Sequence, residues 1–389
     1  MLPLEGRRLW FVGIGGAGLS SYAFLARAWG AEVGGWDRVE TPYLHTLEGI
    51  EVVIAPEPIV PEGWEIVVSS AYSTVPGTSR ADFLAELVSL RRAIVVAGAH
   101  GKTTTTGMIA FVLAELRLDP AWLVGGEIAQ LGGNAGAGDG WLVVEGDESD
   151  RTVERLRPEI AVVTNVELDH HSTFASAAEV EELFERWLAE VPQVVRGWEL
   201  EPVSLELAVP GVHNRRNAAA ALAALELAGV ARADAEPVLA RFRGAGRRFD
   251  IVGERGGVTV VDDYAHHPSE IVATVEAARE RTDGRVLVLF QPHLYSRTRH
   301  LAYELGAALS TADAACVTEI YQAREEPIDG VSGKLVVAAL RPGLRAGWAP
   351  RVEDGARIVA SWARPGDLVL TVGAGDVERA GPLVLEALS

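Results

Sequence analysis

Short apolar segments rich in valine and isoleucine recur along this chain, and stretches with helical spacing of apolar residues separate them. Strands of this kind are buried on both faces, as in parallel sheets covered by crossover helices. The alternation therefore predicts an α/β protein with parallel sheets. The segments expected to form strands are residues 9–13, 66–70, 93–98, 141–146, 160–165, 258–263, 285–290, 314–319 and 367–373.

The length of 389 residues exceeds what one hydrophobic core usually organises, so we expect three domains. Strand-to-loop transitions at Gly13 and Gly98 each begin a phosphate-binding design, which predicts a first boundary between them, near residues 90–93. The polar, glycine-broken stretch 241–250 predicts the second boundary, because a new strand follows it. The predicted domains are residues 1–92, 93–246 and 247–389.

The composition argues against several classes of protein. No run of about 18 uncharged apolar residues occurs and the N-terminus lacks the features of a secretory signal, so we expect a cytoplasmic protein without membrane insertion. The net charge of −19 argues against a nucleic-acid or anionic-membrane surface, because both need clustered cations. The single cysteine, Cys316, excludes an internal disulfide and is interpreted as a core residue.

A glycine-rich loop at residues 98–103, GAHGKT, follows an apolar strand and precedes a helical run, which is the context a phosphate loop requires. Glycines let backbone N–H groups approach phosphate oxygens, and the helix N-terminus adds a positive dipole. Lys102 can reach the terminal phosphates, and Thr103 can bind Mg²⁺. Val96 stands where the general GxxxxGK[ST] pattern begins with glycine. The alternative is a glycine-rich turn with a solvated lysine.

A second glycine loop, FVGIGGAGLS, has Gly13, Gly15 and Gly18 in GxGxxG spacing directly after a strand, with Asp37 about 20 residues further on. This pattern indicates a diphosphate group on a helix N-terminus. From these residues alone a nicotinamide cofactor, a flavin, another nucleotide diphosphate and a simple tight turn all remain open.

Acidic and histidine-rich segments follow two further strands. Crowded carboxylates repel one another unless a cation or solvent relieves them, so a divalent metal is expected at this edge, with a solvated acidic turn as the alternative. A neutral imidazole beside carboxylates can join such a site. The residues concerned are Glu145, Asp147, Glu148, Asp150, Glu167, Asp169, His170 and His171.

Polar clusters also occur further along the chain. His213, Asn214 and Asn217 begin a helix and suit a purine edge, or else cap the helix. Arg247 and Arg248 lie at the expected hinge, where they could meet phosphates or remain solvated. Two clusters after strands of the last domain suit a carboxylate-bearing substrate, although surface polarity is the alternative for any one member. These are Asp262, Asp263, Tyr264, His266 and His267, and then His293, Tyr295, Arg297 and Arg299.

Taken together, these residues resemble the Mur ligase family of bacterial cell-wall synthesis, and in particular its alanine-adding branch. A recycling branch that attaches a tripeptide to the same sugar nucleotide shares nearly all of the motifs. The likeness covers nearly the whole chain and rests on FVGIGGAGLS, GAHGKTTTT, EGDESD, TNVELDHH, GVHNRRNAAAA, GAGRRF, DDYAHHP, QPHLYSRT and GAGD.

The resemblance implies a Rossmann-like N-terminal domain that holds UDP, a central P-loop ATPase-type parallel sheet that holds ATP, and a Rossmann-like C-terminal domain that closes over them. The first glycine loop would then bind the UDP diphosphate. The implied activity is an ATP-dependent ligase of peptidoglycan synthesis that joins L-alanine to UDP-N-acetylmuramate through an acyl phosphate, with ATP and Mg²⁺ required. Domain closure would exclude water from the acyl phosphate.

The resemblance also implies roles for individual residues. ATP would contact Gly98, Ala99, His100, Gly101, Lys102, Thr103, Thr104, His213, Asn214, Asn217, Arg247 and Asp263. The UDP substrate would contact Gly13, Gly15, Gly16, Gly18, Asp37, Ser69 and Ser70. Thr103, Glu148 and His170 would hold Mg²⁺. The residues expected to carry catalysis are Lys102, Glu148, His170, His266, His293 and Arg297, of which the last three would position L-alanine.

Two departures from the family pattern stand out. Leu294 occupies a position where the family commonly has arginine or a comparable polar residue, so Arg297 is expected to carry more of the carboxylate binding. The segment 191–209 is much shorter than its counterpart in typical members. Rivals outside the family are a nicotinamide-dependent oxidoreductase and a non-enzymatic nucleotide-gated binding module. The sequence leaves monomer or dimer open.

Overall fold

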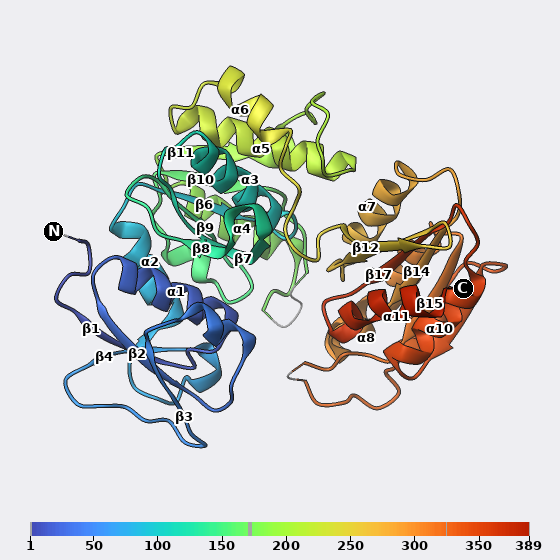
Figure 1. Ribbon diagram of the computed structural model, residues 1–389, viewed down its shortest axis with the longest axis horizontal. Coiled ribbons are helices and arrows are strands. Elements are labelled where there is room, and N and C mark those ends of the chain that lie inside the picture. The colour runs from blue at the N-terminus through green and yellow to red at the C-terminus, as the bar shows by residue number, and fades with distance from the viewer. Residues whose placement is uncertain (1, 170–172, 324, 389) are drawn as a thin grey trace. The chain divides into compact units, whose positions relative to one another are not determined.

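The computed structural model describes residues 2–169, 173–323 and 325–388. The chain divides into two compact units. The first comprises Met1–Val166, Ala178–Glu201 and Ala218–Leu239, and the second comprises Glu167–Ala177, Pro202–Asn217 and Ala240–Ser389. Within the described residues the first unit holds two sheets and the second unit holds a third, which Figure 1 shows in blue, in teal to green and in yellow to red.

The first sheet is entirely parallel, with the strand order β3-β2-β1-β4-β5. The chain moves outward from β1 in one direction through β2 and β3, and in the other through β4 and β5, so the carboxyl end of β1 is the switch point where such sheets place ligands. The elements are β1 (Arg8–Val12), α1 (Ala17–Ala28), β2 (Glu32–Asp37), β3 (Glu51–Ile54), β4 (Glu65–Val68), β5 (Thr78–Ser79) and α2 (Arg80–Ser89).

Aromatic residues fill both faces of this sheet. Trp10 and Trp36 pack with Val12 and Val68 in one buried cluster. On the other face Phe11 meets Phe83 of α2 edge to face, with ring centroids 5.5 Å apart. Alternate residues of β1 therefore anchor opposite layers, which fixes the loop that follows β1.

The second sheet has the order β11-β10-β6-β9-β7-β8 and is parallel except for the β7–β8 pair. Its central strand β6 is fully buried along its length, as the sequence pattern predicts. The strands are β6 (Ala93–Ala97), β7 (Ala121–Ile128), β8 (Gly133–Gly136), β9 (Leu142–Glu145), β10 (Ile160–Val163) and β11 (Gln193–Arg196).

Helix α3 (Lys102–Glu115) is buried on every side from Thr104 to Leu113, because it packs against β6, β7, β9 and α6. Its first residue is the lysine of the glycine loop, so the position of Lys102 depends on the packing of the whole helix. The other helices of this part of the chain are α4 (Ala177–Leu188), α5 (Val212–Leu227) and α6 (Arg232–Leu239). Short 3₁₀ helices occur at η1 (Pro42–Thr46), η2 (Ser70–Tyr72), η3 (Ala129–Leu131), η4 (Thr152–Arg155) and η5 (Gly197–Glu199).

The third sheet has the order β12-β13-β17-β14-β15-β16, with only the β12–β13 pair antiparallel. Its strands are β12 (Asp250–Arg255), β13 (Val258–Asp263), β14 (Val286–Phe290), β15 (Ala314–Thr318), β16 (Arg345–Ala349) and β17 (Leu368–Val372). The helices are α7 (Pro268–Arg279), α8 (Tyr295–Leu309), α9 (Gly333–Ala338), α10 (Val352–Trp362), η6 (Asp376–Arg379) and α11 (Ala380–Ala387).

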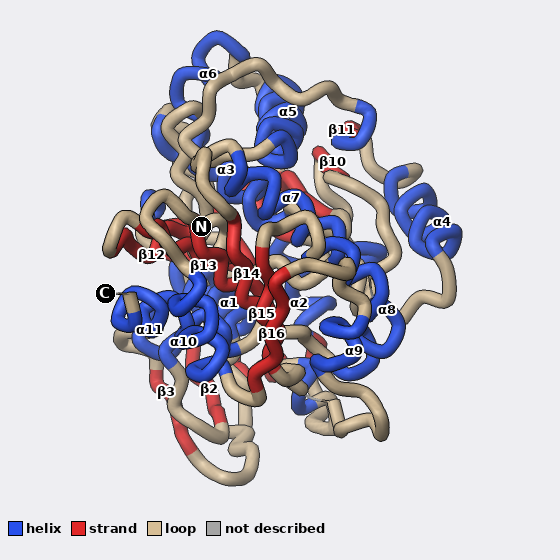
Figure 2. The backbone as a smooth tube through the Cα atoms, turned by 90° about the vertical axis from the view of Figure 1, so that its right-hand side faces the viewer, coloured by secondary structure: helices blue, strands red, loops and turns tan. Residues whose placement is uncertain are grey.

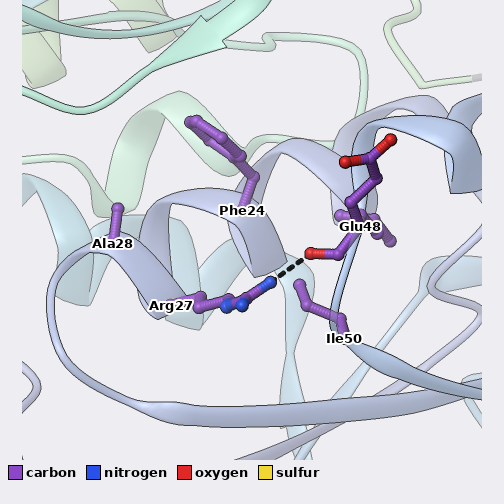
Figure 3. Close-up of a pocket in the computed structure, with 6 residues that line it drawn as sticks. Phe24, Arg27, Ala28, Glu48 and Ile50 are labelled. Atoms are coloured by element: carbon purple, nitrogen blue, oxygen red, sulfur yellow. Dashed lines mark hydrogen bonds between the residues drawn. The ribbon is translucent and has the colours of Figure 1, made fainter.

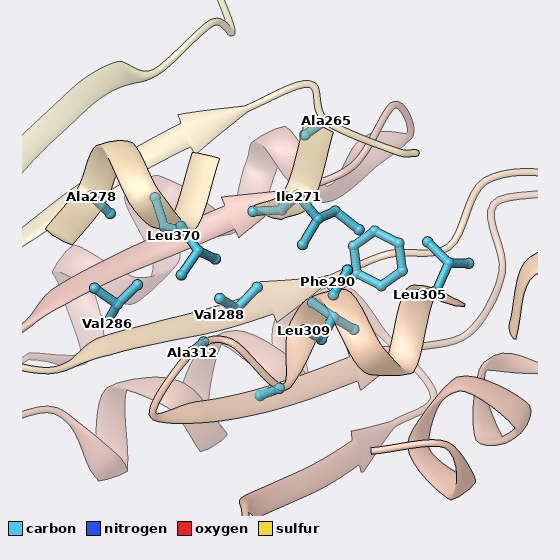
Figure 4. Close-up of a cluster of buried hydrophobic side chains, with 14 of the residues drawn as sticks. Ala265, Ile271, Ala278, Val286, Val288, Phe290, Leu305, Leu309, Ala312 and Leu370 are labelled. Atoms are coloured by element: carbon cyan, nitrogen blue, oxygen red, sulfur yellow. The ribbon is translucent and has the colours of Figure 1, made fainter. Parts of the chain in front are cut away.

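Helices cover both faces of the third sheet. One buried cluster joins its strands to α7, α8 and α9, and another joins them to α10 and α11. Figure 2 shows α8 and α9 on one side of β15 and β16, with α10 on the other. In the first cluster Phe290 lies between Ile271 and Leu305 (Figure 4).

The prediction of an α/β protein with parallel sheets is confirmed. Each of the nine predicted strand segments overlaps a strand, with ends that differ by up to two residues. The pattern misses edge strands such as β8, GNAG, because glycine-rich segments carry no apolar signal. No helix within the described residues is long and apolar enough to cross a membrane.

The buried side chain of Phe290 supplies a test of the third sheet. Phe290→Ala should lower the free energy of unfolding of the second unit by about 3–5 kcal/mol, because it removes a fully buried ring and leaves a cavity. Urea-dependent hydrogen exchange of amides in β13, β14 and β17 would measure the loss. Tyr303 lies in α8, which packs on the same face of the sheet as the Phe290 ring, but it is 75 % exposed. Tyr303→Ala is therefore the matched control and should change the free energy of unfolding by less than about 0.5 kcal/mol. Equal losses in both variants would contradict this packing.

Candidate functional site

The loop between β6 and α3 has the backbone shape of a phosphate loop. Gly98 and Gly101 have φ angles of 126° and 80°, which side-chain-bearing residues rarely adopt. A Cβ atom at Gly98 would lie 2.3 Å from Thr164 Oγ1, so the site also excludes any side chain there. Gly101 is the N-cap of α3 and, having no side chain, cannot itself satisfy the first helical N–H groups, which suit an anion.

Two residues directly after the neighbouring strand β10 hold this loop in place. The backbone N–H of His100 donates to Asn165 Oδ1 and its carbonyl accepts from Asn165 Nδ2, both at 2.9 Å. The Thr164 hydroxyl donates to the same carbonyl at 2.5 Å. The TN pair of TNVELDHH thus shapes the glycine loop, a role that the sequence reasoning did not predict.

Lys102 points back across the loop. Its Nζ donates to the carbonyl of Gly98 at 2.5 Å and lies 3.0 Å from Glu148 Oε2. Burial alone would lower the pKa of Lys102, but Glu148, Asp147 and Glu145 raise it above its ordinary value. The lysine is therefore a fixed positive charge against the carbonyl groups of Gly98 and Ala99, paired with a carboxylate that is itself buried.

A second carboxylate bonds the neighbouring threonine. The Thr103 hydroxyl donates to Glu145 Oε2 at 3.2 Å, and the backbone N–H of Gly125 donates to Glu145 Oε1 at 2.6 Å. Hydroxyl and carboxylate oxygens are the ligands that Mg²⁺ prefers, so Thr103, Glu145 and Glu148 form a donor set that fits the ion. His170, the third predicted metal ligand, lies outside the described residues.

The first glycine loop has a comparable design. Gly13 has a φ of 86°, and a Cβ there would lie 2.8 Å from Ser69 Cβ and 2.9 Å from the Tyr72 ring. The backbone N–H of Gly15 donates to Asp37 Oδ2 at 2.7 Å. Asp37 therefore braces this loop through a carboxylate oxygen.

Helix α1 begins after Gly16, which makes no side-chain capping bond. The N–H groups of its first turn suit an anion. Ser69 is the N-cap of η2, and its hydroxyl accepts from the N–H of Ala71. The structure thus brings the predicted UDP residues Gly13, Gly15, Gly16, Asp37 and Ser69 to the carboxyl edge of the first sheet, with Gly18 on the first turn of α1 and Ser70 as the first residue of η2.

In the second unit, three of the predicted alanine-site residues gather around Asp169. Arg297 donates from Nε to Asp169 Oδ1 at 3.0 Å, and its Nη2 lies 2.9 Å from the same oxygen. His293 Nδ1 is 3.2 Å from Arg297 Nη1, and His266 Nε2 is 3.7 Å from Asp169 Oδ2. From the sequence, Asp169 was expected in a metal site. Its pairing with Arg297 could not be predicted, because the two residues lie 128 positions apart and in different motifs.

Burial, with the charges of His266 and Arg297, lowers the pKa of His293 to about 3. The ring is therefore neutral at physiological pH. It stacks on Tyr321 with centroids 5.8 Å apart. The next residue, Leu294, has a φ of 70°, a strained conformation for a leucine that turns the chain into α8.

Glu167, which the sequence reasoning placed with the metal-binding carboxylates, accepts a hydrogen bond from Ser269 Oγ at 2.6 Å. It lies 3.8 Å from His267 Nδ1. Its contacts within the second unit are thus to the first turn and cap of α7.

Two predicted ATP contacts have structural partners in the second unit. Asp263 accepts from the N–H groups of Phe249 and Ala265, and burial raises its pKa to about 6. Arg247 pairs with Asp262 at 2.9 Å and donates to the carbonyl of Gly373. Both residues brace the 244–249 segment, and their contact with ATP stays a prediction.

The predicted purine-binding residues occupy the start of α5. Burial lowers the pKa of His213 to about 4, so the ring is neutral. Asn214 Nδ2 donates to the carbonyl of Pro210 at 2.6 Å, and Asn217 Nδ2 donates to Asn214 Oδ1 at 3.4 Å. The hydrogen bond of Asn214 agrees with the capping alternative, while a purine contact stays a prediction.

A cavity of about 370 Å³ lies elsewhere in the first unit, between α1 and the segment 47–50. Figure 3 shows Phe24, Ala28 and Ile50 lining it, with Arg27 donating to the carbonyl of Glu48. The lining includes none of the predicted site residues, so this cavity is not the candidate site.

Comparison with known proteins agrees with this geometry. The model of the Mur ligase middle domain matches residues 96–196, which contain the Lys102 loop. The model described as Mur ligase, glutamate ligase domain, matches residues 247–375, which contain His266, His293 and Arg297. Together they match more than half of the chain.

Curated relatives match over their full length. The UDP-N-acetylmuramate–L-alanine ligase of Streptomyces coelicolor is 40% identical, covering 100% of this chain and 99% of that protein. The enzyme of the same name from Pelotomaculum thermopropionicum is 36% identical, covering 96% of each.

Solved structures share the architecture. The UDP-N-acetylmuramate-alanine ligase of Thermotoga maritima is 27% identical with a TM-score of 0.79, covering 97% of this chain and 98% of that one. A murein peptide ligase from Psychrobacter arcticus is 23% identical with a TM-score of 0.65, covering 98% of each chain, and shows the common fold. On its sequence, its domains and its fold, this chain belongs to the Mur ligase family.

Proposed function

We propose that this protein is an ATP-dependent ligase that joins L-alanine to UDP-N-acetylmuramate in the synthesis of peptidoglycan precursors. The observation that carries the proposal is the position of Lys102, which follows a loop whose glycines Gly98 and Gly101 have positive φ angles and which pairs with the buried Glu148. The full-length likeness to L-alanine ligases at up to 40% identity supports the choice of amino acid.

In the proposed reaction the lactyl carboxylate attacks the γ-phosphate of ATP, and the amine of L-alanine then attacks the acyl phosphate and releases phosphate. Phosphoryl transfer asks the protein for positioning and charge neutralisation. Lys102 and the loop N–H groups would hold the β- and γ-phosphates, which requires Lys102 to exchange Glu148 for phosphate oxygens. The first glycine loop, Asp37, Ser69 and Ser70 would hold the UDP part.

Thr103 and Glu148 would hold Mg²⁺, together with His170, and Glu145 would orient Thr103. Bound Mg²⁺ neutralises charge on phosphate oxygens. His213, Asn214 and Asn217 would receive the adenine region, with Arg247 and Asp263 near the ribose and phosphates.

Arg297 would bind the carboxylate of L-alanine, with His266 and His293 beside it. A guanidinium has five donor hydrogens, and the bonds to Asp169 use only Nε and Nη2. One hydrogen of Nη1 is directed at His293 Nδ1, so the second hydrogen of Nη1 and the second hydrogen of Nη2 remain to meet a substrate carboxylate. Asp169 can thus fix the arginine without blocking it.

We also propose the domain boundaries 1–92, 93–246 and 247–389, since each range encloses the strands of one sheet. The substrates are metabolites of the cytoplasm, where the enzyme is expected to act. A net charge of −19 fits a protein without nucleic-acid partners.

The amino-acid substrate can be tested by phosphate release. With UDP-N-acetylmuramate and MgATP, addition of L-alanine should start release of inorganic phosphate in equal amount to the amide product. The tripeptide L-alanyl-γ-D-glutamyl-meso-diaminopimelate, in place of L-alanine, should not. Release with the tripeptide alone would make the protein the recycling ligase and contradict the proposal.

Lys102→Ala should abolish turnover, because the phosphates lose their only lysine contact, while binding of UDP-N-acetylmuramate stays within a few fold. Steady-state rates and calorimetric titration measure the two effects. Lys334→Ala, which removes the exposed lysine over Trp348, is the control and should retain the wild-type rate. Parallel loss of turnover and UDP-substrate binding in Lys102→Ala would rule out separate roles for the two loops.

Arg297→Ala should raise the KM for L-alanine by about 10–100-fold, the usual value of a charge-assisted hydrogen bond, and leave the KM for ATP nearly unchanged. Arg299→Ala, an exposed arginine two residues further along α8, is the matched control. Because Arg297→Ala leaves Asp169 buried without this partner, the double variant Arg297→Ala/Asp169→Asn separates lost binding from lost stability. An unchanged KM for L-alanine in a folded single variant would remove Arg297 from the substrate site.

A further inference from the structure

Arg80, which the sequence reasoning passed over, packs directly against the first glycine loop. It is the first residue of α2, and its side chain crosses to the first turn of α1. A Cβ at Gly18 would lie 3.5 Å from Arg80 Nε and 3.8 Å from Cζ. Gly18, the third glycine of the pattern, thus leaves the guanidinium lying against the helix backbone.

The guanidinium keeps one donor that its protein neighbours do not satisfy. Its Nε is buried and donates no hydrogen bond to any described residue. A buried donor without a partner is costly, so native proteins retain one mainly where a ligand, ion or water completes it. Tyr22, one turn along α1 from Gly18, is a hydrogen-bonding and electrostatic partner of the Arg80 side chain but leaves Nε without a partner.

Carboxylates surround Arg80 at a distance. Burial lowers the pKa of Arg80, but Tyr22, Asp147 and Asp150 together raise it above its ordinary value, and no described carboxylate lies within 4.0 Å of the guanidinium. Asp147 also interacts with Lys102. Arg80 is therefore held positively charged beside the helix N-terminus without being neutralised by direct contact.

We propose that Arg80 binds the diphosphate of the sugar nucleotide, as the side-chain cation of a site whose other donors are the N–H groups of the first glycine loop. This inference rests on the proposed function. A guanidinium suits phosphate because it offers paired, planar donors with a permanent charge. The first glycine loop contains no lysine or arginine of its own, so a cation for the diphosphate must come from another element.

The diphosphate is favoured over the lactyl carboxylate because Arg80 touches the first turn of α1, where the loop N–H groups gather. The carboxylate must reach the γ-phosphate at the Lys102 loop, which belongs to a different sheet of the same unit. Arg80 is thus assigned to binding and positioning, and not to the phosphoryl-transfer step.

Calorimetric titration of the full chain would test this assignment, with a non-hydrolysable ATP analogue and Mg²⁺ present to fill the Lys102 loop. The probes are UDP-N-acetylmuramate, UDP-N-acetylglucosamine, which lacks the lactyl carboxylate, and UMP, which lacks the second phosphate. Arg80→Gln should raise the Kd of both UDP-sugars equally, by about tenfold or more, and should raise the Kd of UMP by less. Arg80→Lys should recover part of the loss. Arg8→Gln, which removes an exposed arginine paired with Glu32, is the control and should bind as wild type.

Several outcomes would overturn the assignment. Unchanged binding of both UDP-sugars by a folded Arg80→Gln variant would do so, as would equal loss for UMP and the UDP-sugars. A loss of affinity for UDP-N-acetylmuramate alone would indicate that Arg80 binds the lactyl carboxylate instead of the diphosphate. If Arg80→Gln fails to fold, Arg80→Lys decides, since an undiminished affinity for UDP-N-acetylglucosamine together with a lowered melting temperature would leave only a structural role. Failure of the wild-type protein to bind either UDP-sugar would instead refute the proposed function.

Discussion

The ion pair between Lys102 and Glu148 is the interaction on which the central part of this protein depends. Both side chains are largely removed from water, so neither charge is tolerable without the other. The lysine opens α3, a helix buried on almost all sides, and the glutamate follows the buried strand β9. A shift of either element would break the pair, and the glycine loop would lose the cation at its centre.

Three buried or half-buried arginines elsewhere in the molecule differ in how far carboxylates and carbonyl groups pair with them. Arg297 is braced by Asp169 and retains free donor hydrogens, whereas Arg247 is committed to Asp262 and to a backbone carbonyl. Arg80 has charged neighbours but no direct ion pair among the described residues. The number of donors that protein partners leave unused therefore separates arginines poised for ligands from those that brace the fold.

Parallel topology explains how residues far apart in the sequence reach a common place. In the first two sheets later strands lie on both sides of the first strand, β1 or β6, so the loop after that strand stands at the carboxyl edge where open α/β sheets place ligands. The first two sheets use this position for a glycine loop followed by a helix. The third sheet places there the segment from Asp263 to His267 and the segment beginning at His293, which supply histidines and an arginine instead of a phosphate loop.

The sequence by itself determined the fold class, the central strands, both glycine loops and the family, because buried parallel strands and phosphate loops require particular residues at fixed local spacing. It could not predict edge strands such as β8, whose glycines pack without an apolar pattern. Only the tertiary structure decided which side chains are neighbours. Asp169 joins Arg297 across 128 residues, and Arg80 at the start of α2 meets Gly18 in the first turn of α1. Such pairings follow from strand order and burial, for which local spacing carries no signal.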